Sequence, residues 1–113
     1  MTASAPEPDR VSGRCCLVRA GDKTIVEIRL AETPADANLY DCVREHAALG
    51  VADVVVDVDG VAPSLALVRR LGRLRVATVR TWTTVHLRND SFALRRLLYA
   101  VGMSAFFPPV DEP

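Results

Sequence analysis

Residues 52–58 read ADVVVDV, a nearly continuous run of valines that leads into the turn Asp59-Gly60. A short, unbroken run of β-branched residues is typical of a strand inside a parallel sheet, because such a strand is buried on both of its faces. We therefore expect residues 52–58 to form a central strand that is covered on both sides. Helical and strand patterns alternate before and after it.

Upstream of this strand the sequence predicts a hairpin and then a helix. Residues 14–19 and the strictly alternating residues 24–30 are separated by turn-forming residues, an arrangement typical of two antiparallel strands. The helix is expected to begin at Thr33, Pro34 and Asp36, which suit the cap, the first helical position and the positive end of the helix dipole. Three apolar residues spaced four apart form its buried stripe: Leu39, Val43 and Ala47.

Downstream, two more helices alternate with two more strands. The second helix is expected from about Ser64, and its inward residues are Leu67, Leu71 and Leu74. A β-branched and aromatic stretch at 81–87 predicts the next strand. Ser91 is expected to cap a third helix, whose buried stripe is Leu94, Leu97, Leu98 and Val101. Residues 105–110 contain two prolines and can form only a short edge strand.

The predicted order of elements is β-β-α-β-α-β-α-β. Strands that alternate with helices imply right-handed crossovers, so we expect an α/β fold with a mixed, mostly parallel sheet. Residues 1–12 are small, polar and contain proline, and they are interpreted as a flexible N-terminal arm. Residues 13–110 are expected to form a single domain, as suits a chain of 113 residues.

The overall composition narrows the classes of function. Half of the residues are apolar, and fourteen basic residues balance fourteen acidic ones, which argues against nucleic acid as the main partner. Neither a membrane-spanning stretch nor a signal peptide is recognisable, so no membrane insertion is expected. The three cysteines are odd in number, and Cys15 and Cys16 are adjacent, which predicts no disulfide framework and a cytoplasmic location.

The charges are unevenly distributed along the chain. Residues 1–59 carry a net charge of −5, whereas residues 60–99 carry eight arginines against Asp90 alone, a net charge of +7. Arg69 and Arg73 are four residues apart in the expected second helix, so they share one of its faces. This asymmetry indicates either a binding face or two parts of one fold that neutralise each other.

No motif in the sequence identifies an enzyme. There is no glycine-rich phosphate loop, and the cysteines and histidines lack the spacing of a metal site, so neither a cofactor nor a metal is expected. Cys42 and His46 are four residues apart in the first helix and could be neighbours, although such pairs often arise by chance. His86 is interpreted as a strand residue with satisfied hydrogen bonds. Asp57 and Asp59 lie where α/β sheets bind ligands, but turn formation explains them more simply.

Three segments together match the pattern of a known family. They are the hairpin and helix GDKTIVEIRLAETPADANLYDCV at 21–43, the strand and turn VVVDVDGV at 54–61, and the strand, capped helix and aromatic-proline ending VHLRNDSFALRRLLYAVGMSAFFPPV at 85–110. In these segments and in its order of elements, the chain resembles the STAS domain, the fold of bacterial anti-sigma factor antagonists. The resemblance spans roughly residues 14–110 and implies the STAS fold for the domain.

The resemblance also implies a function. STAS domains of this kind are non-enzymatic regulatory domains that bind a protein partner in transcription regulation, namely an anti-sigma factor with a kinase-type ATPase fold. The partner binds the loop and helix after the central strand, and a phosphate on a serine there blocks binding by its size and charge. The expected partner-binding residues of this chain are Asp59, Gly60, Pro63, Ser64, Arg69 and Arg73, with Ser64 as the candidate phosphorylation site.

The chain departs from the family in this loop. Members that antagonise anti-sigma factors carry Asp-Ser-Ser/Thr-Gly, whereas this chain reads Pro63-Ser64-Leu65-Ala66. The hydroxyl is kept without its usual neighbours, and the N-cap of the second helix is itself a sufficient reason for a serine. Two alternative functions stay open, an accessory subunit of a transporter ATPase and a sensor that binds a small ligand near Asp57.

Overall fold

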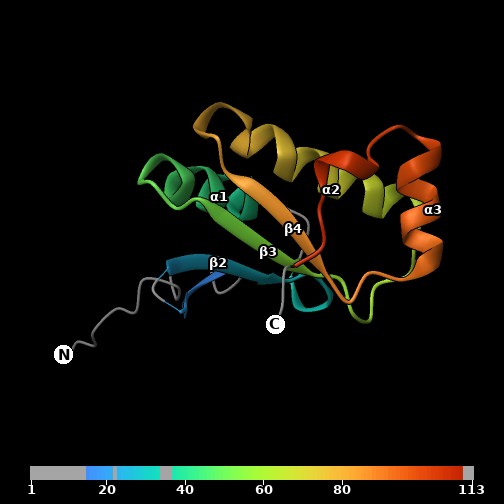
Figure 1. Ribbon diagram of the computed structural model, residues 1–113, viewed down its shortest axis with the longest axis horizontal. Coiled ribbons are helices and arrows are strands. Elements are labelled where there is room, and N and C mark those ends of the chain that lie inside the picture. The colour runs from blue at the N-terminus through green and yellow to red at the C-terminus, as the bar shows by residue number, and fades with distance from the viewer. Residues whose placement is uncertain (1–14, 22, 34–36, 111–113) are drawn as a thin grey trace.

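The structure is a computed structural model that describes residues 15–21, 23–33 and 37–110 (Figure 1). The predicted arm, residues 1–12, lies outside the described residues. In chain order the elements are β1 (Cys15–Ala20), β2 (Lys23–Arg29), the 3-10 helix η2 (Leu30–Glu32), α1 (Ala37–Ala48), β3 (Asp53–Asp57), α2 (Leu65–Thr78), the 3-10 helix η3 (Val79–Thr81), β4 (Thr84–Arg88), α3 (Phe92–Ala100) and the 3-10 helix η4 (Ser104–Phe106).

The four strands form one mixed sheet in the order β1-β2-β3-β4. β1 and β2 are antiparallel and form the predicted hairpin, whereas β2, β3 and β4 are parallel. The register places Val26 opposite Val54, and Val54 opposite Val85. The predicted α/β class with a mixed, mostly parallel sheet is therefore confirmed.

The hydrophobic core lies between the sheet and the helices. Val26, Val54 and Val85 lie side by side on neighbouring strands and are fully buried. Leucines from all three helices pack in the same core: Leu39, Leu67, Leu71, Leu74, Leu94 and Leu98. Each right-handed crossover moves one strand further in the same direction, so α1 and α2 lie on the same face of the sheet (Figure 1).

The valines of the central strand are buried on both faces, as predicted, although one face of the sheet carries polar side chains. Val55 points to this face and is flanked in register by Glu27 on β2 and His86 on β4. Glu27 also forms an ion pair with Arg88 across β3. These half-buried side chains shield Val55, which is 4 % exposed. A continuous run of valines therefore occurs here in a strand that has one polar face.

The predicted start of the first helix is wrong at Thr33. The hydroxyl of Thr33 donates a hydrogen bond of 2.7 Å to the carbonyl of Arg29, and its backbone N–H donates to Leu30 O at 3.1 Å. Thr33 therefore closes η2 instead of capping α1, which begins at Ala37. The predicted roles of Pro34 and Asp36 fall outside the described residues. The stripe Leu39, Val43 and Ala47 is buried, as predicted.

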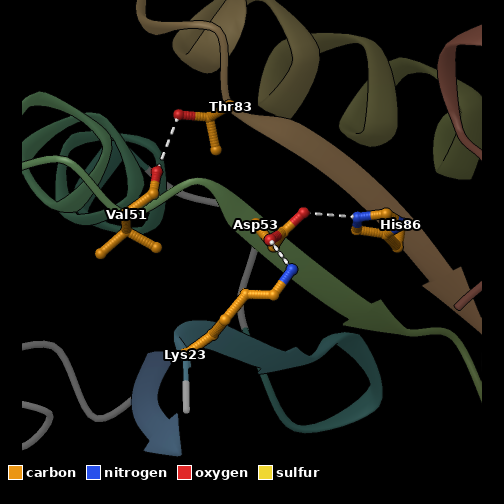
Figure 2. Close-up of polar contacts among 5 residues, drawn as sticks. All are labelled: Lys23, Val51, Asp53, Thr83 and His86. Carbon is orange, nitrogen blue, oxygen red and sulfur yellow. Dashed lines mark hydrogen bonds and ion pairs between the residues drawn. The ribbon is translucent and has the colours of Figure 1, made fainter. Parts of the chain in front are cut away.

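The strand predicted at 81–87 begins later, at Thr84. The chain continues from α2 into η3, and Trp82 then takes a left-handed φ of 61° that turns the backbone toward the sheet. The hydroxyl of Thr83 donates to Val51 O at 3.0 Å and fixes this turn to the segment that enters β3 (Figure 2). Residues 81–83 have a high β propensity, but η3 and the turn at Trp82 occupy them, so the strand starts only after this turn.

α3 begins as predicted, because the hydroxyl of Ser91 accepts a hydrogen bond of 3.0 Å from the backbone N–H of Leu94. Leu94 and Leu98 are buried, and Leu97 is partly buried. The prediction is wrong for Val101, which is 43 % exposed because it lies just beyond the last residue of α3.

The edge strand predicted at 105–110 is reduced to a single parallel bridge between Leu87 and Pro109. The N–H of Leu87 donates to Pro108 O at 3.0 Å. Pro108 and Pro109 have no N–H to continue the ladder, and the residues before them form η4. This short bridge still ties the C-terminal segment to β4, as Figure 1 shows.

Candidate functional site

The loop between β3 and α2 is held by its own hydrogen bonds. Asp57 Oδ1 accepts from the backbone N–H of Asp59 at 3.0 Å and from Asn89 Nδ2 at 3.0 Å. Gly60 has a left-handed φ of 82°, and a Cβ there would lie 3.4 Å from the side chain of Ala31. Asp57 Oδ1 is therefore used in forming the turn, which supports the turn explanation of these aspartates.

Ser64 is the N-cap of α2, as predicted. Its backbone is extended, and its hydroxyl accepts a hydrogen bond of 3.1 Å from the backbone N–H of Leu67. Ser64 and Pro63 are both exposed, so this end of the helix is open to solvent. The cap satisfies one of the free N–H groups at the helix start and leaves the serine accessible.

Four arginines on α2 surround a hollow in the surface of the protein. They are named here the arginine face and are Arg69, Arg70, Arg73 and Arg75. The hollow has a volume of about 660 Å³. The rest of its lining comes from α1, from α2 and from the segment around η4, and consists of Tyr40, Gly72, Val76, Met103 and Phe106.

Three of these arginines are held by contacts with other parts of the chain. The guanidinium of Arg73 lies over the ring of Tyr40, 5.3 Å from its centroid, and that of Arg75 lies over Phe106 at 4.9 Å. Arg70 Nη2 donates to Thr33 O at 2.7 Å. Stacking on an aromatic ring restrains an arginine without using its N–H donors. The positive charge of the arginine face is therefore held in place around the hollow.

The arginine face has no acidic counterpart in the part of the chain that the structure describes. The ion pairs there involve other cations, namely Lys23, Arg29, Arg44, His86, Arg88 and Arg95. Two more polar groups at the hollow, Tyr40 Oη and Arg70 Nε, are buried without a hydrogen-bond partner. Buried polar groups are usually hydrogen-bonded. The hollow is thus lined by positive charge that no described carboxylate compensates.

The sequence prediction finds only part of this site. Arg69 and Arg73 do share a face and line the hollow, whereas the predicted loop residues lie before α2 and are not part of its lining. Tyr40, Met103 and Phe106 were missed, because they come from distant segments. Tyr40 directly follows Leu39, the first residue of the buried stripe on α1, and therefore lies at the edge of that stripe. This position is the one sequence signal that pointed to Tyr40.

Cys42 and His46 are close, but they do not form a pair of thiol and base. Cys42 is disulfide-bonded. His46 Nδ1 lies 3.6 Å from Cys42 Sγ and donates to Cys42 O at 2.8 Å. Since a carbonyl only accepts, Nδ1 holds a proton and does not act as a base there. The sequence predicts no disulfide framework, yet Cys42 does form a disulfide, so the cytoplasmic location inferred from the cysteines stays a prediction without that support.

A second polar cluster joins three strands on the polar face of the sheet (Figure 2). Asp53 on β3 accepts from His86 Nε2 on β4 at 2.8 Å and from Lys23 Nζ on β2 at 3.3 Å. Burial alone would raise the pKa of Asp53, but the hydrogen bonds and charges of His86 and Lys23 outweigh it and hold this pKa below 3.8. His86 Nδ1 is buried without a partner, so the prediction of a satisfied histidine is wrong for that nitrogen.

No family model matches the sequence, and no curated protein is significantly similar to it. Among the described residues, no group of three or more His, Cys, Asp or Glu side chains is arranged to hold a metal ion. None of the described helices is long and apolar enough to cross a membrane. The geometry of the arginine face and its hollow is therefore the main guide to function.

Proposed function

We propose that this protein is a regulatory domain that binds a protein partner through the β3–α2 loop and the arginine face of α2. The observation that carries the proposal is the arginine face itself, which has no carboxylate partner among the described residues. Arginine is enriched in protein interfaces, and charge of one sign attracts a partner surface of the opposite sign. The partner therefore presents acidic side chains to α2.

The resemblance to STAS domains supports a particular class of partner, an anti-sigma factor with a kinase-type ATPase fold that acts in transcription regulation. A mixed sheet whose parallel strands are linked by helices agrees with that resemblance. Ser64 is exposed at the start of α2, where a kinase can reach it. A phosphate there would add about −1.5 to −2 charges. Arg69 lies five residues further along the helix, about 7.5 Å away along its axis, so the phosphate would weaken the attraction for an acidic partner.

Substitution of both Arg69 and Arg73 by glutamate is expected to slow association with the anti-sigma factor about tenfold at low salt. Both side chains are exposed, so the fold should not change, and loss of the contact between Arg73 and Tyr40 should lower the Tm only slightly. The defect should diminish as the salt concentration rises, because salt screens the repulsion between the new carboxylates and the acidic partner. Stopped-flow association rates at 25 and 300 mM salt measure the effect.

A matched control changes the net charge by the same amount away from the hollow. Arg80 and Arg96 are also exposed, and Arg80→Glu/Arg96→Glu should associate nearly as fast as the unmodified chain. An Arg69→Glu/Arg73→Glu variant that associates as fast as the unmodified chain at 25 mM salt would show that the arginine face is not the partner surface.

Two substitutions of Ser64 should distinguish its structural role as a helix cap from a regulatory role in partner binding. Ser64→Ala is expected to lower the free energy of unfolding by about 0.5–2 kcal/mol, because it removes the hydrogen bond to Leu67. Ser64→Asp should be nearly neutral in stability, since aspartate also caps helices, yet it should weaken binding to the anti-sigma factor. Urea denaturation and equilibrium binding measure the two effects. A Ser64→Asp chain that binds as tightly as the unmodified chain would contradict the regulatory role.

A further inference from the structure

Gly72 lies in the middle of α2 and lines the hollow, although the fold does not require a glycine there. Gly21, Gly50, Gly60 and Gly102 have a positive φ, whereas Gly72 has ordinary helical geometry. A Cβ at this position would meet Met103 Cε at 3.5 Å, which is an ordinary van der Waals contact with the end of a flexible side chain. A helix with glycine at an interior position is less stable than the same helix with alanine there. The chain thus keeps a destabilising residue where a side chain would fill the hollow.

The lining of the hollow combines apolar and cationic surfaces. Val76 is 72 % exposed and Phe106 is 44 % exposed, and the adaptable thioether of Met103 lies beside Gly72. The guanidinium groups of the arginine face surround these apolar groups, with Arg73 stacked on Tyr40 on one side and Arg75 on Phe106 on the other. A ligand that carries an apolar group between two carboxylates would complement this lining, because the apolar group would meet the apolar side chains and the carboxylates would meet the guanidinium groups.

We infer that the hollow binds an acidic peptide segment of the partner and receives one apolar side chain over Gly72. This inference rests on the proposed function and deepens it. The flanking carboxylates of the peptide pair with Arg69 and Arg73 on one side and with Arg75 on the other. A peptide fits better than a small anion, because the hollow is an open feature of the helix surface and two of its arginines are exposed, whereas small-molecule sites enclose most of their ligand.

The test selects peptides from a random 12-residue display library on the immobilised full chain. Sequences with Leu, Met or Phe between Asp or Glu residues should be enriched on the unmodified chain and not on the Gly72→Leu chain. In fluorescence anisotropy, Gly72→Leu should weaken binding of an enriched peptide at least about tenfold, since the added side chain occupies the site. Ala66→Leu adds the same side chain on an exposed turn of α2 outside the hollow and should leave the affinity unchanged.

Gly72→Ala provides a second readout that does not depend on a large side chain. It should raise Tm by about 3–5 °C, because alanine favours the helix, and it should also weaken peptide binding. Gain of stability with loss of binding is expected only if the glycine serves a ligand. A library that enriches no sequence, or peptides that bind the Gly72→Leu chain as tightly as the unmodified chain, would overturn the inference. Dimerisation that Gly72→Leu abolishes would overturn it too and assign the hollow to a second copy.

The outcomes distinguish this inference from the proposed function. If acidic peptides bind in the hollow but the anti-sigma factor does not bind the full chain, the hollow is a peptide site and the proposed partner is wrong. If the anti-sigma factor binds the Gly72→Leu chain and the unmodified chain equally, partner binding stands and the hollow is not its site.

Discussion

Phe107→Ala is expected to lower the free energy of unfolding by about 3–5 kcal/mol. Phe107 is fully buried in the same core as the leucines of α2 and α3. It follows η4 and precedes the bridge between Leu87 and Pro109, so its ring holds the C-terminal segment against the sheet. Removing the ring leaves a cavity that the surrounding side chains fill only in part. Urea denaturation monitored by circular dichroism measures the loss.

The neighbouring phenylalanine is the matched control. Phe106 is 44 % exposed and contacts the guanidinium of Arg75. Phe106→Ala should therefore cost no more than about 1 kcal/mol, the scale of an exposed cation–π contact. Equal losses for Phe106→Ala and Phe107→Ala would contradict the assignment of Phe107 to the core.

Asp53→Ala is expected to lower the free energy of unfolding at pH 6 by about 1.5–3 kcal/mol, the scale of hydrogen bonds to charged groups. The substitution removes the acceptor for both Lys23 and His86 and leaves both ring nitrogens of His86 without a partner in a half-buried place. Asp41→Ala, which removes an exposed ion pair with Arg44, should cost less than about 1 kcal/mol. If Asp53→Ala and Asp41→Ala lower the free energy of unfolding by the same amount, the cluster around Asp53 stabilises the fold no more than an exposed ion pair does.

The contribution of Asp53 should also depend on pH in a defined direction. Its pKa in the folded protein lies below the ordinary value of 3.8, so the unfolded chain takes up the proton at higher pH than the folded chain. The stabilisation is complete above the unfolded pKa and is lost as pH falls through the folded pKa. The difference in stability between the unmodified chain and Asp53→Ala should therefore narrow from pH 6 to pH 2.5 in urea titrations. A difference that widens would reverse the sign of the assigned pKa shift.

Local patterns were sufficient for most of the fold. The valine run at 53–57 and the alternation in β2 specify strands, and the hydroxyls of Ser64 and Ser91 specify two helix starts. These signals lie within a few residues of the structure that they produce, because capping and side-chain periodicity are local effects. The spacing of Arg69 and Arg73 placed them on one face for the same reason.

Contacts between distant segments decided the rest. Thr33 was available as a helix cap, but its hydroxyl bonds to Arg29 and its carbonyl is used by Arg70, 37 positions away. The hollow likewise depends on Tyr40 and Phe106 meeting the arginine face from two other parts of the chain.

The sequence by itself determined which segments contain β1 to β4 and α1 to α3, where α2 and α3 begin, and that arginines gather on α2. The tertiary structure decided that β3 has one polar face, that the C-terminal segment pairs through one bridge, and that the arginines line an open hollow at Gly72. The physical reason is the range of the forces involved. Backbone propensity and capping act within a turn or two of the chain, whereas burial, ion pairing and the shape of a surface exist only once remote segments are packed together.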